Sequence, residues 1–204
     1  MFNLERAAEV AAYFLSKHGG SMDKVKLNKL MYLAECECIL SYGTPLTDDL
    51  MFSHDLGPIL ENSDTFFRNG PKNTYEQEVW SKWFKTLDKA SIEISLNTKD
   101  FGEAFQDKFN NLFRAARKIM DQIYSEYGDK SHKDIVSLVH SSKVCPEWRR
   151  PVSHGEHEIT IENLCSCHGK TSKEIKEIID SIKVNREMSQ AMEALANYGR
   201  ILPN

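Results

Sequence analysis

Long hydrophobic runs are missing from this sequence of 204 residues, and so is any excess of positive charge. No window approaches the roughly 18 consecutive apolar residues of a transmembrane helix. Glu5, Arg6 and Glu9 interrupt the N-terminal segment before an apolar core develops, so we do not expect a secretory signal. The chain has 26 Lys and Arg against 30 Asp and Glu, a net charge of −4, which argues against general nucleic-acid binding. We therefore expect a cytoplasmic protein that does not bind membranes.

A disulfide framework is also missing. The five cysteines are an odd number, and no secretory signal accompanies them, so thiols in a reducing compartment are expected. Hydrophobic residues make up 41% of the chain, too many for a disordered protein. A chain of this length buries enough surface to fold as one domain without a stabilising metal.

Helical spacing of apolar residues dominates the pattern that is present. It recurs in segments near 4–15, 25–40, 80–87, 105–127, 135–139 and 171–198, with shorter helices expected from Ile59 and from Thr160. The helix containing residues 25–40 is apolar nearly all round, so we predict that it is the central helix. Leu50–Phe52 and the alternation at 92–96 could form short strands, and Gly57-Pro58 is interpreted as a turn into the next helix. We predict a mainly α, single compact domain of six or seven helices with at most a short β-hairpin, plus a long C-terminal helix.

Enzymatic signatures are weak. His168-Gly169-Lys170-Thr171 includes the GKT of a phosphate-binding loop but lacks the preceding glycine, so a helix end followed by a cap is the better interpretation. A zinc site is an alternative to small core cysteines and surface histidines, although it lacks the usual C-x₂-C spacing. Its candidate ligands are His154, His157, Cys165 and Cys167. Histidines such as His140 could serve in acid–base chemistry, but no partner group is evident in the sequence. We expect no catalytic residue and no cofactor.

Three motifs in a fixed order resemble the Panacea domain, also described as the SocA-like antitoxin domain and found in phage-associated GepA-type proteins. They are the run from Lys26 to Ala34 (KLNKLMYLA), the Leu56–Ile59 step (LGPI), and Leu138-Val139-His140 followed by Pro146-Glu147-Trp148. The motif positions singled out here are Lys26, Leu27, Lys29, Leu30, Tyr32, Gly57, Pro58, His140 and Trp148. The resemblance covers about residues 5–168, so we expect a helical domain over residues 1–168. The long helix lies mostly beyond the resemblance and is expected as a helical extension over 169–204, packed on or next to the domain.

The same resemblance implies an antitoxin of a type II toxin–antitoxin module that binds and neutralises a cognate toxin protein, and SocA-like members are also described as adaptors for the ClpXP protease. Alternatives are a protein-interaction adaptor without a toxin, a metal-dependent enzyme and, last, a nucleic-acid binder. The resemblance implies neither an oligomeric state nor the identity of the toxin.

Roles within the motifs can also be proposed from their chemistry. Leu27 and Leu30 are expected in the core, and Lys26 and Lys29 at the rim of the same helix. Pro58 fits the first position of a helix. We expect Trp148 to fold back and seal the domain, with His140 fixing the loop by a hydrogen bond. The alternative is that this loop forms the toxin-facing surface.

Overall fold

The computed structural model describes residues 2–86, 88, 91–151 and 157–201. This part of the chain contains nine helices and five short strands, so the predicted mainly α class with a long C-terminal helix is confirmed. The helices are α1 (Leu4–Lys17), α2 (Lys24–Tyr42), α3 (Glu61–Asn69), α4 (Thr74–Trp83), α5 (Glu103–Gln106), α6 (Arg114–Tyr127), α7 (His132–Val139), α8 (Ile161–Cys167) and α9 (Ser172–Ile201). The strands are β1 (Ser21–Asp23), β2 (Met51–His54), β3 (Gly57–Leu60), β4 (Glu93–Ser95) and β5 (His157–Glu158).

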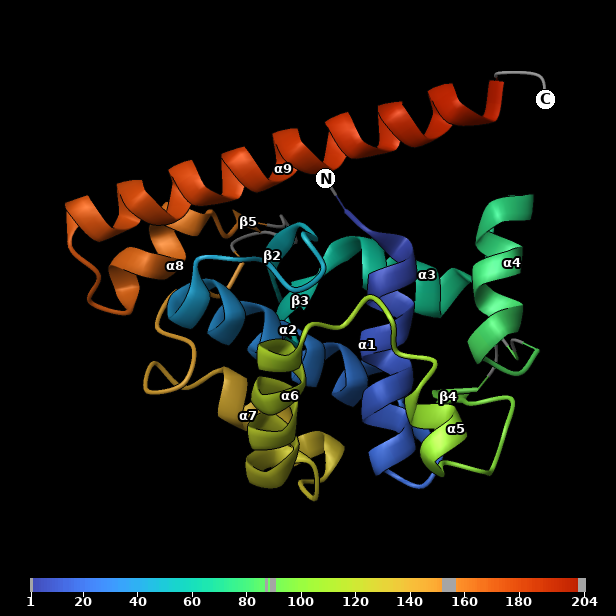
Figure 1. The fold of residues 1–204 in the computed structure, drawn as a ribbon. Coiled ribbons are helices and arrows are strands. Elements are labelled where there is room, and N and C mark those ends of the chain that lie inside the picture. The colour runs from blue at the N-terminus through green and yellow to red at the C-terminus, as the bar shows by residue number, and fades with distance from the viewer. Residues whose placement is uncertain (1, 87, 89–90, 152–156, 202–204) are drawn as a thin grey trace.

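Helix α2 lies at the centre of the domain, as predicted, with the other elements arranged around it (Figure 1). It begins after Asp23, whose carboxylate accepts the N–H of Lys26 at 2.9 Å, and ends at Gly43, which adopts the left-handed conformation with φ 59°. It packs against α1, α3, α6, α7, α8, β1 and β3. A helix contacted on every side has little room for a polar face, which explains its apolar circumference.

The strands form two small sheets, more than the single hairpin predicted. In one, β2 pairs antiparallel with β3 on one edge and with β5 on the other. In the second, β1 pairs antiparallel with β4, so that Met22 lies opposite Ile94. The alternation at 92–96 is therefore a strand. The pattern alone could not identify this strand, because it has only three residues and its partner lies about seventy residues earlier in the chain.

Three predicted helices differ from the structure. The helix expected at 80–87 runs instead from Thr74 to Trp83, and Phe84 after it is extended and pairs with Leu96. Pro58 does not begin a helix but lies in β3 opposite Ser53, and α3 starts at Glu61. The segment 105–127 is not one helix but α5 and α6 joined by an irregular turn. Side chains satisfy the main-chain groups of that turn: the Glu9 carboxylate accepts the N–H of Asn111 at 2.9 Å, and the Arg117 guanidinium donates to the carbonyl of Phe109. Phe109 is fully buried, so the apolar spacing persists although the helix is broken.

The C-terminal segment has the helix start and the helix end that its sequence predicts. Thr160 caps α8, and Gly169 adopts a positive φ of 78° in the turn that follows. Thr171 and Glu174 exchange hydrogen bonds as a capping box at the start of α9, so the GKT string is a helix cap, as interpreted. Helix α9 then runs across one side of the domain (Figure 1). None of the helices in the described ranges is both long and apolar enough to cross a bilayer.

Candidate functional site

Two side chains of α2 hold the backbone of β3. The Asn28 amide pairs with Leu60 in both directions, donating to its carbonyl at 3.0 Å and accepting its N–H at 3.1 Å. Lys29 Nζ donates to the carbonyls of Pro58 at 2.8 Å and Gly57 at 3.3 Å. Lys26 and Lys29 were expected at the rim of the helix, which is wrong: both are buried, and Lys29 is only 1% exposed. For Lys29 the reason is that the carbonyls of Gly57 and Pro58, at the start of β3, offer acceptors inside the domain.

Burial lowers the pKa of Lys29 to about 7, opposed by nearby Asp64. An amine that changes charge near neutrality can in principle act as a base or nucleophile. Here the ammonium is enclosed and its hydrogens point at two main-chain carbonyls. The arrangement therefore fastens β3 to the central helix and leaves no room for a reactant.

Gly57 is required by both its conformation and its neighbours. Its φ is +97°, a region that residues with a Cβ rarely adopt, and an added Cβ would lie 2.4 Å from Cγ2 of Val139. The glycine thus lets the β2–β3 hairpin approach the end of α7. This close approach explains why the LGPI step and the Leu138-Val139-His140 motif occur together although about eighty residues separate them.

Trp148 is partly buried and packs against the core. Its indole N–H donates to the main-chain carbonyl of His54 at 3.1 Å, and its ring stacks on His140 with centroids 4.2 Å apart. The structure agrees with the sealing role proposed for Trp148, but His140 contacts it by stacking. The hydrogen bond of His140 is to the backbone of Asp55 in the hairpin turn, and burial lowers the pKa of the imidazole.

Glu147 was not singled out by the sequence analysis, yet it joins three segments. The carboxylate is 2% exposed. It accepts the Tyr32 hydroxyl at 2.6 Å and lies 3.0 Å from Nε2 of His168. Burial, together with the nearby carboxylate, raises the pKa of Tyr32 well above its usual value. The available signal was the position of Glu147 between Pro146 and Trp148, because a carboxylate beside a large aromatic ring in a tight loop needs internal partners when it is buried.

The motif residues therefore meet inside the domain. Leu27 and Leu30 are fully buried, as predicted. The polar motif side chains bond to the domain's own backbone and side chains. Chemically, the cluster holds α2, the β2–β3 hairpin, the 145–148 loop and α8 together. It is the structural centre of the fold.

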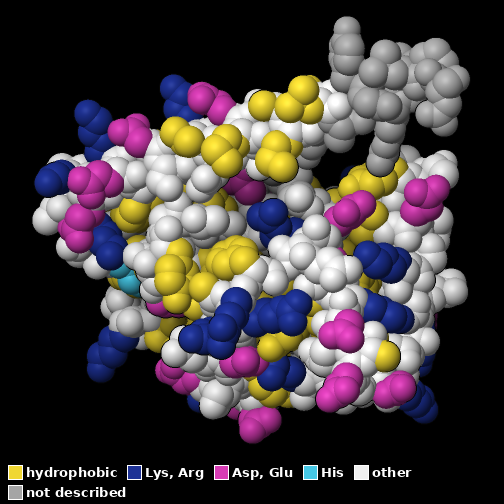
Figure 2. Space-filling model, in the orientation of Figure 1, with side chains coloured by type: hydrophobic (Ala, Val, Ile, Leu, Met, Phe, Trp, Pro, Cys, Tyr) yellow, Lys and Arg dark blue, Asp and Glu magenta, His cyan; other side chains and the backbone are white. Residues whose placement is uncertain are grey.

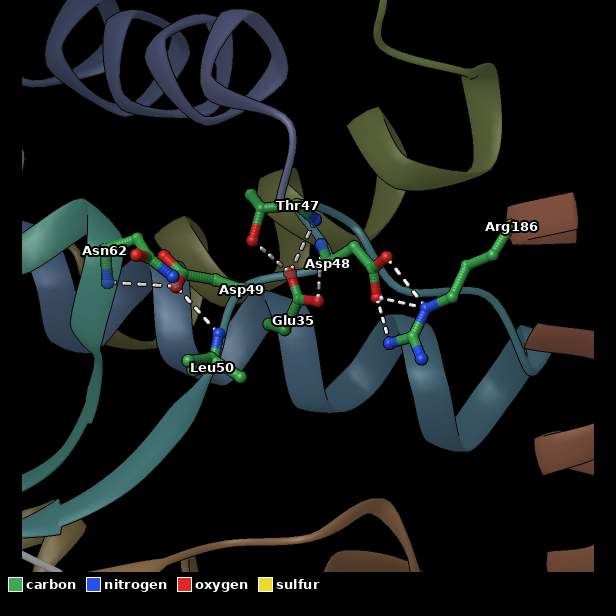
Figure 3. A network of polar contacts seen from close by, with 7 residues as sticks. All are labelled: Glu35, Thr47, Asp48, Asp49, Leu50, Asn62 and Arg186. Atoms are coloured by element: carbon green, nitrogen blue, oxygen red, sulfur yellow. Dashed lines mark hydrogen bonds and ion pairs between the residues drawn. The ribbon is translucent and has the colours of Figure 1, made fainter. Parts of the chain in front are cut away.

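A second polar network lies at the loop between α2 and β2 (Figure 3). The buried Glu35 carboxylate accepts the Thr47 N–H at 2.6 Å, the Thr47 hydroxyl at 2.7 Å and the Asp48 N–H at 3.1 Å. Burial raises the pKa of Glu35 to about 7, opposed by these hydrogen bonds. Asp48 holds a positive φ of 57° and turns its own carboxylate outward toward α9.

Arg186 of α9 pairs with that outward carboxylate. Its Nε lies 2.9 and 3.1 Å from the two Asp48 oxygens, and Nη2 makes a third contact (Figure 3). Burial opposes ionisation of Asp48, but the hydrogen bonds from Arg186 bring its pKa below the usual value. Next to it, the Asp49 carboxylate accepts the N–H groups of Leu50, Asn62 and Ser63 and thereby caps the start of α3.

Helix α9 rests on the domain along a narrow line. Ile182 of α9 is buried against the domain. Cγ1 of Ile178 lies 3.6 Å from the position that a Cβ on Gly43 would take. A cleft of about 660 Å³ opens on one flank, toward the start of α1, α3 and α4. A second hollow of about 540 Å³ lies on the other flank, toward β5 and α8. Ile182, Arg186 and Gln190 line both hollows.

The proposed zinc ligands occupy different environments. His157 is exposed in β5, Cys165 is buried in the core, and Cys167 is half-buried two residues farther along α8. His154 lies outside the described residues. Within the ranges that the structure describes, no three His, Cys, Asp or Glu side chains are grouped so that they could hold a metal ion.

Comparison with protein families gives one match. The model described as "Antitoxin SocA-like, Panacea domain" matches residues 27–149. No curated protein and no solved structure matches the chain. The matched segment begins in α2 and ends one residue after Trp148, so it contains almost all the motif residues described above. Because it covers more than half of the 204 residues, the chain belongs to the SocA-like antitoxin family with a Panacea domain.

Proposed function

We propose that this protein is the antitoxin of a type II toxin–antitoxin module, and that it neutralises a cognate toxin protein by binding to it. The observation that supports this proposal most directly is the family match over residues 27–149. The proposed partner is a protein. The slightly acidic net charge of −4 fits the binding of a protein better than the binding of nucleic acid, which favours a basic surface.

We further propose that the protein acts by binding and not by catalysis. The titratable motif residues support this, since Lys29, Tyr32 and Glu147 are buried and bond within the domain. An antitoxin of this kind needs a rigid body and a complementary surface, and the enclosed polar centre provides the rigidity.

Co-expression with the product of the adjacent gene tests the proposal. That product alone should stop growth, and growth should return when this protein is made with it. A harmless neighbour, or one that remains toxic in the presence of this protein, would contradict the proposed function.

Delivery of the toxin to a ClpXP-type protease is the alternative mechanism. The two mechanisms differ in a strain without that protease: neutralisation by occlusion persists there, whereas neutralisation by delivery is lost and toxin accumulates. Measuring growth and toxin level in the same cultures separates them.

A metal-dependent reaction is the less favoured alternative. It would need zinc bound by the candidate ligands His154, His157, Cys165 and Cys167, and metal binding there would contribute to stability. Elemental analysis of the purified protein tests it, because an enzyme of this type requires stoichiometric metal.

A further inference from the structure

Helix α9 exposes an apolar face between Val184 and Leu195. Val184, Met188, Met192 and Leu195 are between 54% and 72% exposed. Their spacing places them on one side of the helix, and we call them the α9 stripe. Apolar side chains gather along α9 in the space-filling view (Figure 2). Together they expose roughly 400–500 Å² of apolar surface, a patch size that commonly marks an interaction site.

The opposite flank of the same part of α9, from Ile182 to Gln190, faces the 660 Å³ cleft. Three cations, Arg6, Lys72 and Arg186, and three carboxylates, Glu5, Asp48 and Glu76, line the cleft. This balance does not favour a phosphate or another multiply charged anion, which would need an excess of cations.

Uncharged polar side chains also line the cleft. Asn185, Ser189 and Gln190 contribute from α9, and amide groups both donate and accept hydrogen bonds. Phe66 and Ile182 add apolar surface. Amides next to apolar side chains suit a polypeptide segment, whose main chain offers the same donors and acceptors and whose side chains need apolar contacts.

From these features we infer that the α9 stripe and the adjoining cleft together form the toxin-binding surface, contacted on both flanks of the helix by one partner protein. This inference rests on the proposed function. An apolar helix face of the partner covers the α9 stripe, and a neighbouring segment of the same protein enters the cleft. Asp180 and Glu187 follow one border of the stripe at a spacing of seven residues, and both are exposed, with the exposed Lys183 one turn from each.

The area of the stripe decides between a partner of this kind and a second copy of the chain. A stable interface buries about 800 Å² on each side. Pairing two stripes would cover roughly half of that, since the stripe exposes roughly 400–500 Å². A partner that also enters the cleft buries more surface than the stripe alone and comes closer to that area. The α9 stripe lies outside the matched segment 27–149, whereas the cleft is lined on its other side by residues within that segment, such as Phe66 and Lys72.

Calorimetric titration of the purified protein with the toxin encoded beside it tests this inference. Met188→Glu places a charge in the stripe, and Ser189→Trp fills the cleft. Ser172→Glu is the matched control, because it adds the same charge to an exposed position of the same helix about 24 Å from Met188. All three positions are exposed, so circular dichroism should show unchanged folding. We expect Met188→Glu and Ser189→Trp each to raise the dissociation constant at least tenfold, and Ser172→Glu to leave it unchanged.

Three results would overturn the inference. If wild-type protein neutralises the toxin and Met188→Glu binds it within twofold of wild type, the surface is wrong while the proposed function stands. If wild type neither binds nor neutralises the toxin, both fail. If wild type alone sediments as a dimer that Met188→Glu dissociates, the stripe is a contact between copies of this chain.

Discussion

Replacement of Lys29 by methionine should remove a specific pH dependence of stability. The unfolded chain protonates Lys29 below its ordinary pKa of 10.5, whereas the folded protein keeps the amine neutral down to about pH 7. Between these values the unfolded state binds more protons, so this side chain makes the free energy of unfolding rise as the pH increases. From pH 7 to pH 9 the effect amounts to about 2 kcal/mol.

Urea denaturation of wild type and Lys29→Met at pH 7, 8 and 9 measures this effect. The free energy of unfolding of wild type, minus that of the variant, should increase by about 2 kcal/mol over the range. The difference is the useful quantity, because burial also raises the pKa values of Tyr32 and Cys36, and both proteins share those contributions. Lys176→Met, at an exposed position of α9, is the control and should give a constant offset.

A difference between wild type and Lys29→Met that stays constant within about 0.5 kcal/mol from pH 7 to pH 9 would refute the reasoning. It would mean that the ammonium remains charged in the folded protein. In that case the carbonyls of Gly57 and Pro58 would compensate the charge fully, and the interior around α2 would be more polar than the packing indicates.

Three further substitutions test the rest of the structure. Gly57→Ala should destabilise by about 2–4 kcal/mol in thermal or urea unfolding, because the added Cβ meets α7 at a positive φ; an effect below 0.5 kcal/mol would contradict the close approach. Trp148→Phe should cost about 1–2 kcal/mol through the lost indole hydrogen bond, whereas an unchanged melting curve would place the ring at a free surface. Arg186→Gln should cost no more than about 1 kcal/mol in total stability, since the arginine is partly exposed. It should nevertheless speed hydrogen exchange in the second half of α9, and unchanged exchange would show that Asp48 does not anchor the helix.

Local signals in the sequence predicted much of the helical framework. The helix cap interpreted at Thr171 is one example, since its hydroxyl accepts the N–H of Glu174 at 3.3 Å. Such signals succeed because a cap and the groups that it satisfies lie within one turn of chain. The central position of α2 was also predictable, since its apolar circumference requires neighbours on all sides.

The parts that were mispredicted depend on distant contacts. Pro58 is normally a good first residue of a helix, but here the pairing of β3 with β2 and the carbonyl contacts of Lys29 hold it in a strand. A lysine in a helix is ordinarily exposed. Acceptors for a buried Lys29 exist only once the β2–β3 hairpin has folded. Glu147 was overlooked for the same reason, because its partners Tyr32 and His168 come from other segments.

The family motifs identified the centre of the fold better than they identified a binding surface. Gly57, His140 and Trp148 meet as a group because the hairpin, α7 and the 145–148 loop converge. For the α9 stripe, the sequence predicts only that its residues belong to a long helix. Sequence periodicity shows that apolar residues share a face, but it does not show whether the rest of the protein covers that face.

Neutralisation of the adjacent gene product is the most direct test of the central claim, that this protein is an antitoxin acting through binding. Growth should be measured with the neighbour alone, with wild type, and with Lys29→Met as a variant altered only in the interior. The account predicts arrest by the neighbour alone and recovery with wild type, with Lys29→Met also restoring growth when it is folded, because that side chain is enclosed. Arrest that persists with wild type, or recovery that is lost with a folded Lys29→Met protein, would contradict it.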